Sequence, residues 1–379
     1  MTPTSVFPSL SRGDRSDILL ATKSQLSRLG YPVGDSDSPE FDHQFDSVIR
    51  RFQQERGLLC DGLLGPETFG QIELARFRLG DRVLRFDPVR PLRGDDVAEL
   101  QKILSRLGIY TDRIDYIFAE ATDAAVREAQ TGLGLRSDGI AGPTTLSGLR
   151  AVKRDQGEGD VFALQERARV TASGPSLAGR VVVIEAATTR TDFVTTTFPP
   201  GTQSCAEEYA ADIARRLEGR LSALGAATVY VEDSAERATL GDELGASAIV
   251  TINLDSSSSP KAQGAATYYF GRGDDPSVAS PVGRRLAELM QKELCARTGL
   301  LDCRSHPRTW ESLRRVRTPK VHVMPGYISN DEDRAALEDQ RLRDLIAESV
   351  AVSLQRLYLR EETDPPTGTL DLAAVSSQL

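Results

Sequence analysis

The sequence contains little of what metal and disulfide chemistry require. Its 379 residues include only three histidines (His43, His306 and His322) and four scattered cysteines that form no C-x-x-C pair. Such cysteines are typical of reduced thiols rather than of a disulfide framework. No apolar run approaches the length of a membrane span, and the start, M-T-P-T-S-V-F-P-S-L, lacks the basic and apolar regions of a signal peptide. We therefore expect a protein that stays in the cytoplasm.

The charge balance argues against one class of partner. The formal net charge is -9 at pH 7, with 27% charged residues. An acidic chain has no general attraction to nucleic acid or to anionic lipid, so we expect no nucleic-acid partner. The hydrophobic fraction of 40% is ordinary for a globular protein, and the length permits two or three domains.

The first 150 residues contain an internal repeat. The string L-S-R-L-G occurs at Leu26–Gly30 and again at Leu104–Gly108, and each copy continues to a D-G-x-x-G-P-x-T turn. The turn residues are Asp61, Gly62, Gly65 and Pro66 in the first copy and Asp138, Gly139, Gly142 and Pro143 in the second. Apolar residues at helical spacing, followed by a glycine turn with proline at the next helix start, predict three helices in each copy.

These signatures resemble the peptidoglycan-binding type 1 module. The resemblance implies an N-terminal extension (residues 1–11) and two modules (residues 12–78 and 79–152) that bind peptidoglycan or its precursors. A scaffold that docks other proteins is the alternative interpretation. If a glycan groove exists, we expect it near the turns, with Tyr31, Tyr110 and Tyr116 among its lining residues.

The composition changes after the repeat. Residues 153–178 are rich in glycine, serine and charge, which predicts a linker with a helical turn in it. Between residues 179 and 360, β-branched runs such as Val181–Ile184 alternate with amphipathic helical patterns such as Ala210–Leu224. The chain is therefore expected to be a multidomain α and α/β protein that ends in a largely parallel, three-layer α/β/α domain.

A strand near the end of that domain draws attention to one side chain. In P-K-V-H-V-M-P-G-Y-I-S-N, residues 319–330, the alternating half predicts a strand, and Pro325-Gly326 ends it. Met324 then stands at the rim of the sheet, a usual place for chemistry, although a thioether can neither accept nor deliver a proton at neutral pH. His322 faces the same side, and a partly exposed strand histidine is favoured over a metal ligand.

The order of elements and the G-Y-I-S-N motif resemble the zinc-dependent N-acetylmuramoyl-L-alanine amidases. The resemblance places the two zinc-binding histidines on Thr188 and Asn253, the zinc-binding glutamate on Ala206, and the catalytic glutamate on Met324. None of these residues offers an imidazole or a carboxylate to zinc, or a base to water. The resemblance thus implies an amidase-like domain at residues 179–360 that has no cofactor and no hydrolytic activity. Zinc is expected only under the alternative of an amidase with an atypical site.

The last residues suggest a regulatory segment. Pro365-Pro366 ends regular structure, and residues 361–379 are expected to form a disordered regulatory tail. Phosphate on Thr367 or Thr369 would add negative charge and acceptors for an arginine-lined partner.

The whole arrangement, with R-G-L-L-C-D-G, G-Y-I-S-N and P-T-G-T among the shared strings, resembles a group of actinobacterial proteins that regulate peptidoglycan synthesis. The resemblance implies a cytoplasmic pseudo-amidase, phosphorylated on the tail by a serine/threonine protein kinase, that activates the UDP-N-acetylglucosamine enolpyruvyl transferase. Forkhead-associated-domain proteins and a lipid II flippase are further implied partners, which would bring the protein to the membrane. The alternatives are an N-acetylmuramoyl-L-alanine amidase and a module that binds peptidoglycan or its precursors.

Overall fold

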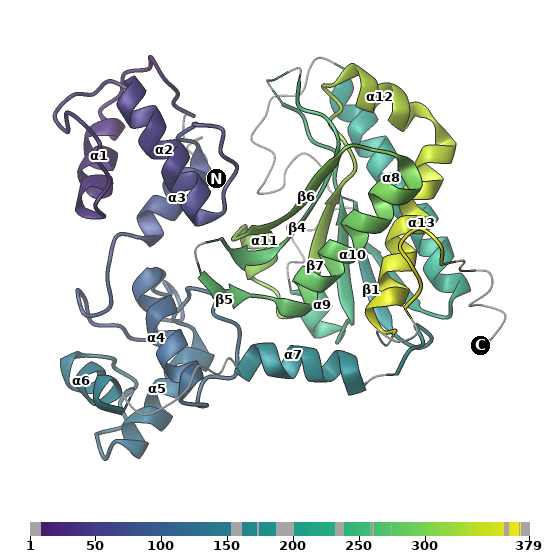
Figure 1. Ribbon diagram of the computed structural model, residues 1–379. Helices are drawn as coiled ribbons and strands as arrows, with labels where there is room; N and C mark the ends of the chain where they lie inside the picture. The colour runs from purple at the N-terminus through teal and green to yellow at the C-terminus, as the bar shows by residue number, and fades with distance from the viewer. Residues whose placement is uncertain are drawn as a thin grey trace. The chain divides into compact units, whose positions relative to one another are not determined.

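The computed structural model describes residues 9–152, 161–172, 174–186, 201–231, 239–257, 259, 261–273, 275–359, 364–370 and 372 of the chain. The chain forms two compact units, residues 1–165 and 166–379. The described part of the first unit is helical, and the second unit is built on a mixed β-sheet, as Figure 1 shows. The predicted combination of α and α/β domains is confirmed.

The first unit contains two modules of three helices each, as the repeat predicts. The first module contains α1 (Ile18–Arg28), α2 (His43–Arg56) and α3 (Pro66–Leu74). The second contains α4 (Asp95–Arg106), α5 (Glu120–Gly132) and α6 (Pro143–Val152). Each module has its own apolar core. Phe52 fills the centre of the first core, whereas Ala129 occupies the matching place in the second.

A buried glutamine ties the repeated turn of the first module to α2. The side-chain amide of Gln53 donates to Asp61 Oδ1 (2.7 Å), to the carbonyl of Leu63 (3.0 Å) and to Thr68 Oγ1 (3.0 Å). Its oxygen accepts from the amide of Gly62 at 2.9 Å. One side chain thereby bonds to four polar groups of the turn, as buried polar groups require on folding.

The second module repeats this arrangement with Gln130. Its amide donates to Asp138 Oδ1 (2.8 Å) and Thr145 Oγ1 (3.1 Å), and its oxygen accepts from the amide of Gly139 (2.9 Å). Gly139 has φ +75°, and a Cβ there would lie 2.1 Å from Asp123 Oδ1, so the turn requires glycine. The D-G-x-x-G-P-x-T signature therefore has a structural role, which is to hold the turn in each module.

Another pair of equivalent positions carries two different polar groups. Lys23 and Gln101 each stand three residues before an L-S-R-L-G string. The fully buried ammonium of Lys23 donates to the carbonyls of Asp35 (3.2 Å), Ser38 (3.0 Å) and Glu40 (2.8 Å). Gln101 instead bonds to the side chains and carbonyls of the corresponding loop in the second module. Each group holds the loop between the first two helices of its module.

The second unit alternates strands and helices around a seven-stranded sheet. Its elements after α7 (Val161–Ala172), in chain order, are β1 (Val181–Ala186), α8 (Thr202–Ala223), β2 (Ala227–Val231), α9 (Leu240–Glu243), β3 (Ala248–Ile252), β4 (Ala265–Arg272), β5 (Asp275–Ala279), α10 (Pro281–Thr298), β6 (Asp302–Arg308), α11 (Glu311–Arg314), β7 (Lys320–Met324), α12 (Asp331–Glu338) and α13 (Gln340–Leu357). The strand order is β2-β1-β3-β7-β4-β5, and β6 also pairs with β4.

The sheet is mixed, and the expectation of a largely parallel sheet holds for only part of it. Strands β2, β1, β3 and β7 are parallel, whereas β4 runs antiparallel to β7 and carries β6 and β5. One face of the sheet is covered by α8, α10 and α13, whose apolar residues form the main core (Figure 1). The other face carries a smaller cluster around Val183 and Ile249 and the short helices α9 and α11.

The segment expected to be a linker contains a longer helix than predicted. Helix α7 extends over twelve residues, from Val161 to Ala172. Glu166 is buried and accepts from Ser280 Oγ (2.7 Å) and from the amide of Val282 (2.9 Å), so its carboxylate caps the start of α10. This contact with a residue more than a hundred positions away stabilises the helix, and local composition does not reveal it.

None of the described helices is both long and apolar enough to cross a bilayer.

Replacing Gln53 by leucine should destabilise the first module strongly. The Gln53→Leu variant leaves the four turn groups without their partner, and we expect a loss of about 2–4 kcal/mol in the free energy of unfolding. Urea unfolding followed by far-UV circular dichroism measures the loss. Gln54 is exposed on the same helix, so Gln54→Leu is the matched control and should change stability by less than about 0.5 kcal/mol. Equal effects of the two substitutions would contradict this interpretation of the signature.

Candidate functional site

The carboxyl ends of β3 and β7 bring two of the predicted site residues together. The two strands are parallel neighbours, with Ile252 opposite Val323. Asn253 follows β3 and Met324 ends β7, and the amide of Asn253 donates to the carbonyl of Val323 at 3.0 Å. Both side chains are buried, Asn253 at 5% exposure and Met324 at 2%. The edge of the sheet therefore has the position expected for an α/β site.

The loops at this edge are held by residues of the G-Y-I-S-N motif. Ser329 Oγ accepts from the amide of Ser257 at 2.9 Å, which joins the loop after β7 to the loop after β3. Asn330 caps α12, since its side-chain oxygen accepts from two amides of the first turn. Asp333 accepts from the amides of Gly264 (2.8 Å) and Tyr327 (2.9 Å). These residues hold the loops at the edge through hydrogen bonds to backbone amides.

The residues at the four matched positions do not fit zinc. Ala206 lies on α8 as a buried part of the apolar core, and its methyl group offers no ligand atom. Met324 offers a thioether and Asn253 an amide, neither of which competes with carboxylate or imidazole for this metal. Thr188 lies outside the described residues. Within the described ranges, no group of three or more histidine, cysteine, aspartate and glutamate side chains is arranged to hold a metal ion.

His322 is a core residue. Its side chain is 1% exposed, so the expectation of partial exposure is wrong. The imidazole packs edge-on against Trp310, with ring centroids 5.6 Å apart, and its Nε2 lies 3.4 Å from Ser312 Oγ. Burial and the neighbouring Lys320 ammonium lower the pKa of His322 well below its usual value. The ring is therefore neutral at physiological pH, and its surroundings oppose a positive charge.

Aromatic rings and one guanidinium continue from His322 across the same side of β4 and β6. The rings of Tyr268 and Trp310 lie 4.8 Å apart, and the guanidinium of Arg308 lies 5.2 Å from the centre of the Tyr268 ring. Burial raises the pKa of Tyr268, and burial and the Arg308 charge lower the pKa of His306. Burial, with the nearby Asp255, raises the pKa of Tyr327 to about 12. These shifts keep the phenols protonated and the imidazoles neutral.

A buried ion pair lies below the edge. Lys320 Nζ is 2.7 Å from Glu185 Oε2, and Thr251 Oγ1 donates to the same oxygen at 2.6 Å. Glu185 lies three residues before Thr188, one of the matched histidine positions. Because its carboxylate is neutralised by lysine and occupied by a hydroxyl, it is not free to act as a general base.

The tyrosines expected to line a glycan groove are placed differently. Tyr110 and Tyr116 are buried, at 3% and 2% exposure, so the expectation is wrong for both. The hydroxyl of Tyr110 donates to the carbonyl of Arg113 at 2.8 Å, which fixes it inside the second module. Tyr31 is partly buried, and its hydroxyl donates to Glu55.

Residues 364–370 belong to the segment that we expect to be a disordered tail. These residues lie against α10 and α13, where Thr367 Oγ1 accepts from Arg356 Nη1 at 3.2 Å. Thr369 is exposed. The sequence analysis missed the residues that receive this segment, Glu293, Arg297 and Arg356. The i,i+4 spacing of Glu293 and Arg297 on a helix was the only signal for them.

Comparison with known proteins agrees with both resemblances. Residues 182–356 match the family described as N-acetylmuramoyl-L-alanine amidase, and residues 16–72 and 93–149 match the peptidoglycan binding domain family. The N-acetylmuramoyl-L-alanine amidase CwlM of Mycobacterium tuberculosis is 38% identical over 376 residues, which covers 95% of this chain and 92% of that protein. The N-acetylmuramoyl-L-alanine amidase LytC of Bacillus subtilis is 25% identical over 150 residues, 38% of this chain and 29% of that protein.

Solved amidase structures are more distant. AmiC2 of Nostoc punctiforme aligns with a TM-score of 0.39 and 20% identity, over 47% of this chain and 96% of its own. Ami1 of Mycobacterium smegmatis aligns with a TM-score of 0.40 and 19% identity, over 48% of this chain and 98% of its own.

His322 should make the second unit less stable in mild acid. Because the folded state lowers its pKa, the unfolded chain binds the proton first as the pH falls through about 6.5, and stability is lost from there downwards. One proton contributes a slope of at most ~1.4 kcal/mol per pH unit, and His322→Gln should remove that contribution. Urea unfolding followed by the fluorescence of Trp310, the only tryptophan, measures the slope.

The control for this measurement is His43→Gln, which alters a histidine on α2 in the first unit and should leave the slope of the second unit unchanged. An acid slope that is the same in His322→Gln as in the unaltered protein would contradict the prediction.

Proposed function

Because the chain belongs to the N-acetylmuramoyl-L-alanine amidase family, as a homologue of CwlM of Mycobacterium tuberculosis, we propose that it is a non-catalytic regulator of peptidoglycan synthesis built on an amidase fold. The observation that carries the proposal is the pair Ala206 and Met324. Both side chains are packed inside the second unit at the positions where the family places a zinc ligand and the catalytic glutamate.

Amide hydrolysis of the family's type requires groups that these positions do not supply. Bound zinc lowers the pKa of a water to about 7, and a carboxylate then moves its proton to the leaving amine. A methyl group and a thioether can do neither. The carboxylate of Glu185, buried below the edge, is paired with Lys320. Ser329, Asn330 and Asp333 hold the loops by hydrogen bonds to backbone amides. The loops at the edge therefore need neither a bound metal nor a catalytic residue to keep their arrangement.

The proposed target is the UDP-N-acetylglucosamine enolpyruvyl transferase, in the cytoplasm. A serine/threonine protein kinase would modify Thr367 or Thr369, and the phosphorylated protein would stimulate the transferase. Forkhead-associated-domain proteins and a lipid II flippase are the further proposed partners, through which the protein would reach the membrane. Two observations support this proposal: the resemblance over nearly the whole chain, and the placement of a partly exposed Thr367 and an exposed Thr369 on the folded domain.

Two other functions each have an observation in their favour. The relatives that match the second unit are named as amidases, which favours hydrolysis of peptidoglycan at an atypical site. The matches to the peptidoglycan binding domain family at residues 16–72 and 93–149 favour binding of peptidoglycan or a precursor. A pull-down on purified sacculi and titration with muropeptide test this second alternative.

Phosphorylated protein should stimulate the transferase, and the Thr367→Ala/Thr369→Ala variant treated with the same kinase should leave the transferase at its basal rate. The reason is that the doubly substituted tail has no hydroxyl at either position to receive phosphate. Steady-state transferase assays with equal concentrations of each protein measure the difference. Mass spectrometry of the tail confirms the phosphate. Equal stimulation by both proteins would refute the switch.

The purified protein should bind zinc weakly and should release no stem peptide from peptidoglycan. Ala206, Asn253 and Met324 supply no anionic or imidazole ligand, so added zinc should be lost on dialysis. Metal analysis after dialysis and chromatography of muropeptide digests measure the two properties, with an active amidase of the family as the positive control. One tightly held zinc together with release of stem peptides would instead establish the amidase alternative.

A further inference from the structure

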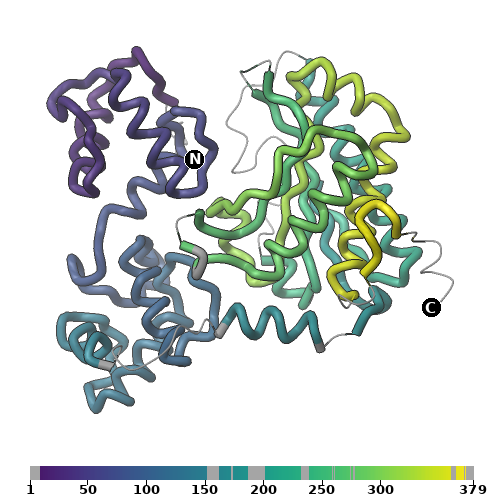
Figure 2. The backbone as a smooth tube through the Cα atoms, in the orientation of Figure 1, coloured from purple at the N-terminus to yellow at the C-terminus, as the bar shows by residue number. Residues whose placement is uncertain are grey.

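A segment after α13 folds back on the second unit. Residues 364–370 and Leu372, which we call the strap, lie beside α13 at the yellow end of the tube in Figure 2, and Leu372 packs against the main core. The strap contains a β-turn in which the amide of Thr369 donates to the carbonyl of Pro366 at 3.2 Å. Gly368 occupies the third position of the turn with φ +81°, as a type II turn requires.

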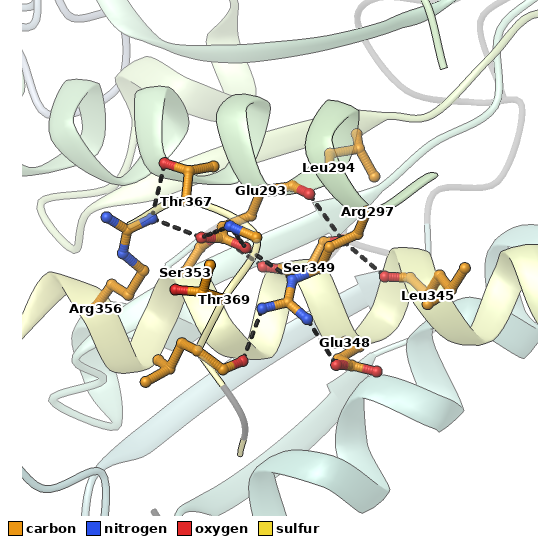
Figure 3. Close-up of polar contacts among 12 residues, drawn as sticks. Glu293, Leu294, Arg297, Leu345, Glu348, Ser349, Ser353, Arg356, Thr367 and Thr369 are labelled. Carbon is orange, nitrogen blue, oxygen red and sulfur yellow. Dashed lines mark hydrogen bonds and ion pairs between the residues drawn. The ribbon is translucent and has the colours of Figure 1, made fainter. Parts of the chain in front are cut away.

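The turn is held by a carboxylate that has no contact with water. Glu293 on α10 is 0% exposed. Its two oxygens accept from the amide of Gly368 at 3.1 and 3.2 Å, from Arg297 Nε at 2.7 Å and from Arg356 Nη1 at 2.6 Å (Figure 3). The carboxylate of Glu293 on α10 therefore binds both α13 and the strap.

The two arginines complete the attachment of the strap. Arg356 also binds Asp364 through two hydrogen bonds, Nε to Oδ1 at 2.6 Å and Nη2 to Oδ2 at 2.8 Å. The same guanidinium donates to Thr367 Oγ1, and Arg297 Nη2 donates to the carbonyl of Leu370 at 2.7 Å. Hydrogen bonds to Asp364 and Glu293 raise the pKa of Arg356.

Among the described residues, both arginines that contact the strap already have acidic partners, which leaves neither of them free for a phosphate on Thr367. Arg356 is already paired with Glu293 and Asp364, and Arg297 is paired with Glu293 and Glu348. A phosphate on Thr367 carries nearly two negative charges. It would have to displace a carboxylate from Arg356 while lying close to Glu293, which is enclosed between the helices and cannot move into water. A second negative charge beside the buried carboxylate of Glu293 is unfavourable, so the phosphate destabilises the docked strap.

Thr369 lies in different surroundings. Its side chain is exposed, and its hydroxyl donates to the carbonyl of Pro366 at 2.7 Å. A phosphate there would point to solvent and remove only this local hydrogen bond, while the backbone bond of the turn remains.

On the basis of the function proposed above, we propose that phosphorylation of Thr367 releases the strap from α10 and α13, whereas phosphorylation of Thr369 leaves it docked. In the modification, the γ-phosphoryl group of ATP passes to Thr367 Oγ1, ADP leaves, and the hydroxyl proton passes to the kinase base and then to water. The phosphate shifts the balance between docked and released strap because it is disfavoured only in the docked state.

Hydrogen exchange on the full chain tests the proposal without any partner. Phosphothreonine is incorporated during translation at position 367 or at position 369, and exchange of the peptide that spans residues 364–372 is followed by mass spectrometry. We expect phosphate at 367 to speed exchange of the strap by about tenfold or more, the equivalent of losing one hydrogen bond to a charged group. Phosphate at 369 should leave the exchange rate unchanged.

A glycine substitution shows independently what holds the strap. In Gly368→Ala the alanine must adopt the left-handed conformation at φ +81°, which side chains disfavour, so this variant should release the strap without phosphate. Gly245→Ala is the matched control, since Gly245 also has a positive φ (+59°) but has open space around it. In Gly245→Ala the amide hydrogens of the strap should exchange at the same rate as in the unaltered protein.

Three results would overturn the proposal: a strap that exchanges at the free rate in the unmodified protein, slow exchange in the protein phosphorylated at 367, or equal release by phosphate at 369. The outcome for the proposed function is separate. Release of the strap without stimulation of the transferase would refute the regulatory function and leave strap release standing. Stimulation of the transferase while the strap stays docked would refute strap release and leave the regulatory function standing.

Discussion

A carboxylate with no exposed surface joins three parts of the second unit that are distant in the sequence. Glu293 on α10 is neutralised by Arg297 of its own helix and by Arg356 of α13, and it also binds the backbone of the strap. Removing one partner of such a buried pair costs about 3–5 kcal/mol, because the remaining charge stays in a dry environment. Ion pairs continue outward from Arg297 through Glu348 and Arg220 to α8. The packing of α8, α10 and α13 therefore depends on each charge in this network having its partner. The strap supplies one of the partners of Glu293.

At the carboxyl edge of the sheet, the residues that hold the loops differ from the residues that pack as part of the apolar core. Two sets of residues serve different purposes there. Ser329, Asn330 and Asp333 hold the loops through hydrogen bonds to backbone amides, and these bonds need no metal. Ala206 and Met324 are buried and pack as apolar residues. The hydrogen bonds of the loops do not involve these two side chains, and fold alone does not imply activity.

Local patterns predicted the parts of the fold that depend on local contacts. The three helices of each module follow from the repeat, and Gln53 and Gln130 form their bonds within 15 residues along the chain. The meeting of Asn253 and Met324 follows from two parallel strands that end at one edge. Strand β6 was missed because D-C-R-S-H-P-R has no apolar alternation and pairs with β4 about 37 residues away. Helix α7 and the strap were missed for a related reason, since Glu166 and Gly368 are held by residues more than 70 positions distant. A Pro- and Gly-rich tail carries no local sign that a buried carboxylate will bind it.

The burial of Ala206 and Met324 also bears on the evolution of this protein. A glutamate at either position alone would be a charge inside the domain without a metal to neutralise it, and the variant would lose stability before it gained any activity. Histidines at 188 and 253 would also be needed before a zinc ion could bind. Each single substitution toward a zinc site should therefore lower the stability of the domain before a metal can bind. Such a site could be gained only through several substitutions made together.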